Sequence, residues 1–314
     1  MRKESAFQLR QSLILLLTAV IWGIAFVAQS VGMEYVGPYT FIAVRYALGA
    51  LVLVPVILLR RKIKASGREE AGNTGLSRSR DISGTVPAEE DRAGSGRKLW
   101  IGGALCGTAL MIASGLQQFG IMQTTVGKAG FITAMYIVLV PILGIFIGRR
   151  CKALIWLCVL IAACGLYLLS MNGSFSLQRG DALCLACAFV FAMQILLVDH
   201  FVNEADGVCL AAIEFLTASV IGTVLMLLFE HPTWQAIYDA RESILYTGIM
   251  SSGVAYTLQI IGQRGLNPTV ASLIMSLESV VSAVAGFLFL HQSFSGRELA
   301  GCMLMAAAIV LAQL

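Results

Sequence analysis

Charged residues are scarce in this chain. Asp, Glu, Lys and Arg together make up 13% of the 314 residues, against about 25% in an ordinary soluble domain. Hydrophobic residues make up 58%, and the mean hydropathy is +0.82. This scarcity excludes a soluble globular domain and indicates a chain that lies mostly in lipid. The net charge of +4 does not indicate nucleic-acid binding, because the basic residues are spread over several polar segments.

Motifs of nucleotide and metal chemistry are also missing. No glycine-rich phosphate loop occurs, so ATP-driven transport would need a separate subunit. His200, His231 and His291 fall at the ends of apolar runs or in polar segments. Cys184 and Cys187 have C-x-x-C spacing but lie inside an apolar run with no histidine nearby. The eight cysteines are scattered and predict no disulfide framework. We therefore expect no cofactor and no metal site.

Ten apolar runs account for most of the chain. Each is close to the roughly 20 residues that a transmembrane helix needs. The sequence therefore predicts an all-α integral membrane protein with ten transmembrane helices. Nine further spans, and the lack of an A-x-A-like cleavage site, favour a membrane helix over a signal peptide for the first run. The runs are 12–30, 38–59, 99–122, 127–147, 153–171, 182–198, 208–229, 244–263, 268–290 and 299–314.

The placement of Lys and Arg predicts the orientation. If the N-terminus is inside, 17 of the 22 basic residues fall in the inner segments, as the positive-inside rule requires. Most lie in the N-terminal tail, residues 1–11, in the segment 60–98, and at 149–152. The second half contributes little to this bias. We expect a multi-pass protein of the cytoplasmic (plasma) membrane with both termini in the cytoplasm.

The segment from about 60 to 98 is the only long polar stretch. It mixes both charge signs with Gly, Ser and Pro and has almost no apolar residues to bury. This composition predicts a disordered cytoplasmic loop. It is either a tolerated insertion or a regulatory, partner-binding segment.

An internal repeat divides the chain into residues 12–171 and 180–314. A shift of 142 residues places Gln117 on Gln259 and Gly144 on Gly286. A shift near 169 aligns the second and seventh runs and pairs Arg45 with Glu214; the polar segment accounts for the difference. Five crossings per half is an odd number, so the halves enter the membrane in opposite directions. Inverted repeats are typical of secondary transporters, which bind their substrate at the repeat interface near the midplane.

The order of several residues resembles a known family. In the first half they are Trp22-Gly23, Pro38, Arg45, Ala129-Gly130-Phe131, Tyr136, Pro141 and Gly165, and in the second Asn267-Pro268, Ala271, Glu278 and Gly286. This series resembles the drug/metabolite transporter superfamily, EamA type, over nearly the whole chain. The family usually has Pro near position 283 and an acidic residue after the ninth helix, where this chain has Ala283 and 291–293 (His-Gln-Ser). The resemblance implies transport of a small polar metabolite, amino acid or drug.

Ionisable residues inside apolar runs are the first candidate site residues, because each is costly in lipid and must face the bundle interior. At 1.5 Å of rise per residue, Arg45 lies about 10 Å from the outer end of its helix and Glu214 about 9 Å from the inner end. Glu278 lies about 15 Å along its helix, near the midplane, and can reach either residue. Such a carboxylate must be protonated, paired or hydrated, which allows proton coupling. The alternative role for all three is to join helices.

Uncharged polar and aromatic residues complete the candidate site. Gln117 and Gln259 are repeat mates, and amides can bind a polar solute or join helices. Trp22, Tyr136 and Tyr256 either line the cavity or pack in the bundle. Weaker candidates of the same kind are Gln29, Gln118 and Gln194. Two Gly-x-x-x-Gly pairs, at 103/107 and 144/148, predict close helix contacts.

The sequence thus predicts a secondary active transporter that works as an exporter, is a monomer or homodimer, and has a small-molecule substrate. A channel or a structural membrane subunit is the alternative. A lipid-processing enzyme would need Asp, His or Ser clustered at one membrane face, and the short connecting segments are poor in them.

The orientation can be tested by labelling a cysteine placed at Arg80. We expect a membrane-impermeant maleimide to leave this position unlabelled in intact cells and to label it after permeabilisation, because the 60–98 segment is predicted to be cytoplasmic. Labelling in intact cells would overturn the predicted orientation.

Overall fold

Helices are the only regular secondary structure in the residues that the computed structural model describes, which are 2–73, 89–124, 126–149, 152–170, 178–290 and 295–312. Eight apolar segments are long enough to cross a membrane, and two shorter ones, Ala153–Leu168 and Leu299–Ala312, complete the predicted ten. The protein is a multi-pass membrane protein. The first-half helices are α1 (Arg2–Gly32), α2 (Pro38–Asn73), α3 (Glu89–Ile121), α4 (Val126–Thr133), α5 (Tyr136–Phe146) and α6 (Ala153–Ser170).

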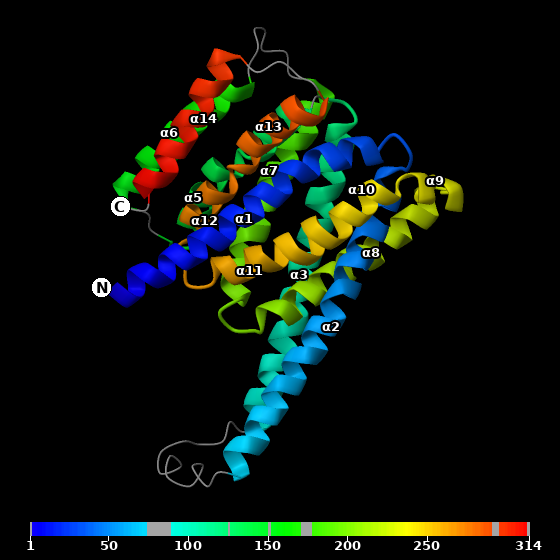
Figure 1. The fold of residues 1–314 in the computed structure, drawn as a ribbon, viewed down its shortest axis with the longest axis vertical. Coiled ribbons are helices and arrows are strands. Elements are labelled where there is room, and N and C mark those ends of the chain that lie inside the picture. Colours follow the sequence, from blue (N-terminus) through cyan, green and yellow to red (C-terminus); the bar gives the residue numbers. More distant parts are fainter. Residues whose placement is uncertain are drawn as a thin grey trace.

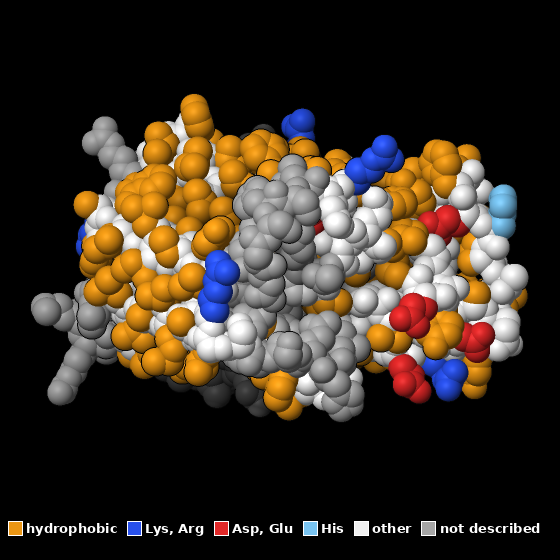
Figure 2. All heavy atoms as spheres, turned by 90° about the horizontal axis from the view of Figure 1, so that it is seen from above, with side chains coloured by type: hydrophobic (Ala, Val, Ile, Leu, Met, Phe, Trp, Pro, Cys, Tyr) orange, Lys and Arg blue, Asp and Glu red, His pale blue; other side chains and the backbone are white. Residues whose placement is uncertain are grey.

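The second half has the same plan, with one segment in π-helical form. Its helices are α7 (Arg179–Phe201), α8 (Gly207–Phe229), α9 (Trp234–Asp239), α10 (Arg241–Leu245), the π-helix η2 (Tyr246–Tyr256), α11 (Thr257–Gln263), α12 (Pro268–Met275), α13 (Glu278–Leu290) and α14 (Gly296–Ala312). Large apolar side chains such as Leu51, Phe146, Leu227 and Val310 are exposed on the outside of the bundle. Figure 2 shows this apolar surface from one end of the molecule, with acidic side chains gathered toward one side and basic ones scattered. Such a surface suits lipid.

The polar segment 60–98 differs from the prediction at both of its ends. Helix α2 continues to Asn73 and α3 begins at Glu89, so disorder is wrong for 60–73 and 89–98. Both stretches are rich in Arg, Lys, Glu and Ala, which have high helix propensity and let a helix continue past its apolar part. Figure 1 shows α2 and α3 side by side beyond the other helices. Residues 74–88 lie outside the described residues. Helix α1 likewise includes most of the predicted N-terminal tail.

Two pairs of repeat-related helices show that the halves are inverted. At one end of the α2–α8 pair, the Glu230 carboxylate accepts hydrogen bonds from Tyr39 N and Thr40 N. At the other end, Arg60 lies 3.6 Å from Asp206. The start of α2 therefore meets the end of α8, and these helices run antiparallel. If the two halves had the same orientation in the membrane, α2 and α8 would run in the same direction.

Helices α6 and α14, the last of each half, give the same result. Gly165 of α6 is packed against the carbonyl oxygen of Gly301, and Tyr167 lies under the guanidinium of Arg297, 5.6 Å from the ring centre. Residue numbers increase along one helix as they decrease along the other, so the pair is antiparallel. Figure 1 shows α6 and α14 together at one side of the bundle.

The fourth span of each half is broken at the same repeat position. Helix α4 ends before Ala134 and α5 starts at Tyr136; α12 ends before Ser276 and α13 starts at Glu278. The second break is made by i→i−3 bonding, because Leu277 N donates to the Ile274 carbonyl and Ser276 Oγ to that of Leu273. Such tight turns and serine bonds interrupt the regular α-helical ladder. Each break places one polar side chain, Tyr136 or Glu278, at a helix start.

Only one of the two glycine pairs makes a helix contact. The positions that Cβ atoms would take at Gly103 and Gly107 of α3 lie 2.5 Å from Ile213 Cγ2 and from the Glu214 carbonyl oxygen of α8. A Cβ atom at Gly144 would have Arg149 Cβ as its nearest neighbour, 3.7 Å away. A Cβ atom at Gly148 would have no neighbour within 4 Å. Gly148 instead has φ +78° just after α5, where glycine ends a helix at little cost. The prediction for the second pair was therefore wrong.

Substitution of Gly107 tests the close contact between α3 and α8. Gly107→Ala should lower the free energy of unfolding by about 1–3 kcal/mol, because the new methyl group has no room. Gly115→Ala in the same helix is the control, since its Cβ meets nothing within 4 Å. Thermal unfolding in detergent measures both variants. Equal melting temperatures for the two variants would contradict the packing.

Candidate functional site

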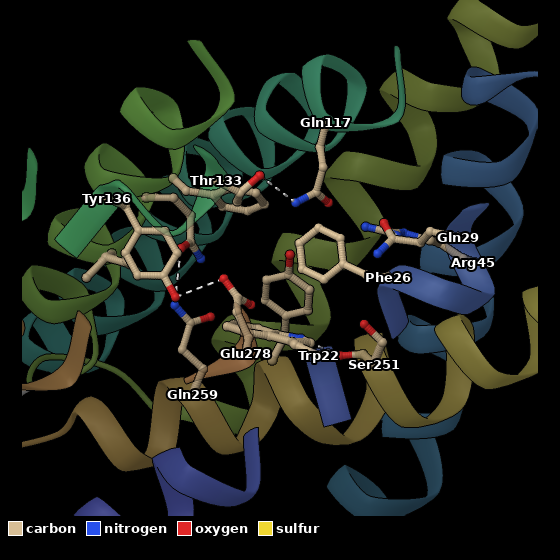
Figure 3. Close-up of a pocket in the computed structure, with 14 residues that line it drawn as sticks. Trp22, Phe26, Gln29, Arg45, Gln117, Thr133, Tyr136, Ser251, Gln259 and Glu278 are labelled. Atoms are coloured by element: carbon tan, nitrogen blue, oxygen red, sulfur yellow. Dashed lines mark hydrogen bonds between the residues drawn. The ribbon is translucent and has the colours of Figure 1, made fainter. Parts of the chain in front are cut away.

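A small cavity lies inside the bundle and is lined by both halves (Figure 3). The centre of a water molecule can occupy about 30 Å³ of it. This is room for about two waters. The lining is polar on several sides, with aromatic rings between. The lining residues are Trp22, Phe26, Gln29, Arg45, Gln117, Thr133, Tyr136, Phe191, Gln194, Ile195, Ser251, Tyr256, Gln259 and Glu278. Seven of the eight residues singled out from the sequence are among them, and Glu214 is the exception.

Glu278 is the acidic group of the cavity. Its side chain is buried, and Oε1 accepts a hydrogen bond of 3.0 Å from the Tyr136 hydroxyl. The two residues occupy the same position in the two repeats, each the first residue after its helix break. The break therefore also places the carboxylate at the N-terminus of α13, where the helix dipole favours a negative charge.

Arg45 is the basic group of the cavity and is 2% exposed. Its Nη1 donates to Gln29 Oε1 at 2.8 Å, and its Nη2 donates to the Tyr46 hydroxyl at 2.6 Å and Ser114 Oγ at 3.3 Å. These neutral acceptors hold the guanidinium in place. The described residues include no ion pair of Arg45 with either buried glutamate, so the pairing with Glu278 allowed by helix depth is not formed in this conformation.

Aromatic side chains form another side of the cavity. The Trp22 and Tyr256 ring centres are 4.6 Å apart, and Trp22 Nε1 donates to the Ser251 carbonyl at 3.3 Å. Ser251 and Tyr256 both belong to the π-helix η2. Short π-helical stretches are frequent at functional sites. This wall combines flat apolar faces with a satisfied indole N–H, which suits the apolar part of a solute.

Two amides that are repeat mates face the cavity from opposite halves. Gln117 Nε2 lies 3.5 Å from Thr133 Oγ1, at the limit of a hydrogen bond. Gln259 Nε2 donates to Gln194 Oε1 at 3.2 Å, and its own Oε1 has no protein partner. Gln117 is weakly held, and Gln259 keeps an unpartnered acceptor, so both amides can bond to a polar solute.

Glu214 lies beside the cavity and does not line it. Its side chain is fully buried on α8, and Oε1 accepts a hydrogen bond of 2.8 Å from Gln194 Nε2. Gln194 does line the cavity. Helix rise predicts the depth of Glu214 but not the direction of its side chain. The structure therefore assigns Glu214 an indirect connection to the site through Gln194.

Several lining residues were not singled out from the sequence, or were weak candidates. Phe26, Phe191 and Ile195 have no sequence signal, because an apolar residue that lines a cavity looks like one that packs in the core. Thr133 and Ser251 are small polar residues of a kind that is common where membrane helices pack together. The amides Gln29 and Gln194 did have a signal, since each lies within an apolar run.

Ion pairs join the two halves at the end predicted to face the cytoplasm. The described residues form three such pairs, and in each the basic residue comes from the first half and the acidic residue from the second. The hydrogen bond and positive charge of Lys98 hold the pKa of the exposed Glu204 below its usual range. At the opposite end, Glu230 binds the first turn of α2. The three pairs are Arg60–Asp206 at 3.6 Å, Lys98–Glu204 at 3.0 Å and Arg149–Asp199.

Metal binding has no support in the part of the chain that the structure describes. No group of three or more His, Cys, Asp or Glu side chains is placed there to hold an ion. Cys184 and Cys187 are both buried free cysteines on α7. The polar groups of the cavity are instead a carboxylate, a guanidinium, amides and hydroxyls, which can bind a small solute by hydrogen bonds and charge.

The family profile decides the class of protein. The profile of the EamA-like transporter family matches residues 10–171 and again 178–314, one match for each half. This chain belongs to the EamA-like transporter family. It is therefore a membrane transporter within the drug/metabolite transporter superfamily, and the sequence resemblance is confirmed.

Relatives of this EamA-like transporter cover nearly its full length. An uncharacterized transporter of Archaeoglobus fulgidus is 24% identical over 99% of this chain and 88% of its own. The uncharacterized transporter YoaV of Bacillus subtilis is 19% identical over 93% of this chain and 92% of its own. A solved structure, described only as the crystal structure of a protein, shares the fold with a TM-score of 0.72 at 17% identity, covering 96% of each chain.

Proposed function

We propose that this transporter carries a small polar solute across the cytoplasmic membrane by alternating access, as a secondary active exporter. The observation that carries the proposal is the cavity between two inverted halves, with Glu278, Arg45 and the amides of both halves in its wall. Inverted-repeat transporters bind their solutes at the repeat interface. A solute with both polar and apolar parts fits a wall that alternates charged groups, amides and aromatic rings.

The ends of the bundle support movement of one half against the other. Three ion pairs join the first half to the second at the predicted cytoplasmic end. Opening this end separates those pairs, and closing it re-forms them. At the other end, the contact between Glu230 and the start of α2 also joins the halves. The small cavity between these two ends is consistent with a closed conformation of a carrier.

Glu278 is the proposed coupling residue. An ionised carboxylate in a closed, nearly dry cavity is costly unless a proton or a cation neutralises it. In this conformation its protein partner is the neutral Tyr136 hydroxyl. A proton and a cationic group of the solute can therefore compete for the carboxylate, so that each leaves when the other binds. Proton entry would then drive solute exit.

Replacement of Glu278 by glutamine tests this role. Glu278→Gln keeps the shape and the bond with Tyr136 but cannot exchange a proton. We expect the purified variant to melt within a few degrees of the natural protein and to lose uphill, pH-driven transport in proteoliposomes. Glu242→Gln is the matched control, because that side chain is 88% exposed and should transport normally.

The substrate for this assay comes from a counterflow screen over amino acids, purines and sugars. Saturable counterflow is expected of a carrier, whereas a channel shows none. Natural pH-dependent transport by a folded Glu278→Gln variant would contradict the coupling role and leave Glu278 a helix-packing residue.

A further inference from the structure

Two hydrogen-bonded chains of side chains, one in each half, connect a buried charge to the cavity. In the first half, Arg45 and Gln118 both donate to Oε1 of Gln29. In the second half, Gln259 donates to Gln194, which donates to Glu214. The three residues come from corresponding helices, which are α2, α1 and α3 in one half and α8, α7 and α11 in the other. The two halves therefore carry amides on corresponding helices, at different repeat positions, and reverse the sign of the charge.

Glu214 Oε1 accepts a hydrogen bond, and this determines how the amides next to it are turned. A carboxyl oxygen that carries no proton can only accept hydrogen bonds. Gln194 must therefore present its NH2 group to Glu214, at 2.8 Å, which turns its carbonyl oxygen toward Gln259. Gln259 must in turn present its own NH2 group to that oxygen, at 3.2 Å.

The last group of this hydrogen-bonded series, the Gln259 amide, lines the cavity, and its oxygen has no protein partner. Gln259 is 1% exposed and lines the cavity, and its Oε1 accepts no hydrogen bond from the protein. Figure 3 shows the Gln259 amide beside the hydrogen-bonded Tyr136 and Glu278. A buried acceptor left unpaired costs free energy, so a donor from the solute would be stabilising here.

We infer that Glu214 is a specificity-determining positioning residue. Through Gln194 it fixes Gln259 as a hydrogen-bond acceptor toward the cavity. Together with the Glu278 carboxylate, this makes the second-half side of the site selective for a solute that carries an N–H donor, such as a primary ammonium group. This inference rests on the proposed transport function and assigns the chemistry of one end of its solute. Glu214 itself acts without touching the solute.

Gln194 is the side chain that donates a hydrogen bond to Glu214 among the described residues. Glu214 Oε2 has no hydrogen-bond partner, and none of the described Lys, Arg or His side chains forms an ion pair with it. The titratable neighbours on adjacent helices are Cys106 of α3 and Tyr256 of η2.

The experiment compares L-alanine with L-lactate, which have an ammonium and a hydroxyl group at the same position. Binding of each probe to the purified, detergent-solubilised full chain is measured by calorimetry. The natural protein should bind L-alanine more tightly than L-lactate. Glu214→Gln removes the fixed amide direction, because the new amide can donate or accept, and should reduce this preference about tenfold, as expected for loss of one charge-assisted bond. Gln194→Leu, which interrupts the chain, should do the same.

A double substitution separates positioning from a general structural effect. If Glu214 acts through Gln259, then Glu214→Gln should change the preference no further in a Gln259→Leu background. Additive effects of the two changes would overturn the proposal. An unchanged preference in a folded Glu214→Gln variant, or no preference for L-alanine in the natural protein, would also overturn it.

The outcomes distinguish this inference from the proposed function. Saturable counterflow of other solutes, with an unchanged alanine preference in the variants, would leave the carrier intact and remove the role of Glu214. A preference that changes as predicted, without any counterflow, would retain the amide chain and remove the carrier.

Discussion

The cost of burying charge and unpaired polar groups in lipid governs this structure. Apolar side chains cover the outside of the bundle, so every ionisable group within a span must find its partners inside. Arg45, Glu214 and Glu278 do so with hydroxyls and amides and not with one another. Neutral partners hold these charges without cancelling them. The charges therefore remain able to attract a proton or a solute.

Because of the inverted repeat, corresponding helices of both halves surround the site, but they carry different residues on its two sides. The same helix break places Tyr136 at a helix start in one half and Glu278 at a helix start in the other. These repeat mates form a hydrogen bond with each other. The same helix position carries Arg45 in one half and Glu214 in the other. In the proposed mechanism, symmetry of the backbone lets the two halves rock against each other, while asymmetry of the side chains gives the cavity a donor side and an acceptor side.

The sequence predicted much of this arrangement because polarity is conspicuous inside an apolar run. Ten spans and four of the seven predicted cavity residues, Arg45, Gln117, Gln259 and Glu278, followed from that contrast, although the functional roles of those residues stay predictions. Phe26 and Ile195 could not be found, because lining and core residues share the same chemistry. The breaks at 134–135 and 276–277 contain neither Pro nor Gly, so nothing local marked them. Glu214 was misplaced because helix rise gives depth and not direction around the axis.

Alternating access to the cavity is the central claim, and accessibility of Ser251 tests it most directly. Ser251 lines the cavity from η2 and is buried in this conformation. A cysteine at this position, in a variant that lacks the native cysteines, is treated with a membrane-impermeant thiol reagent in right-side-out and in inside-out vesicles. The account predicts labelling from both sides, with solute protecting the cysteine in each case. Labelling from one side only, or from neither, would contradict it.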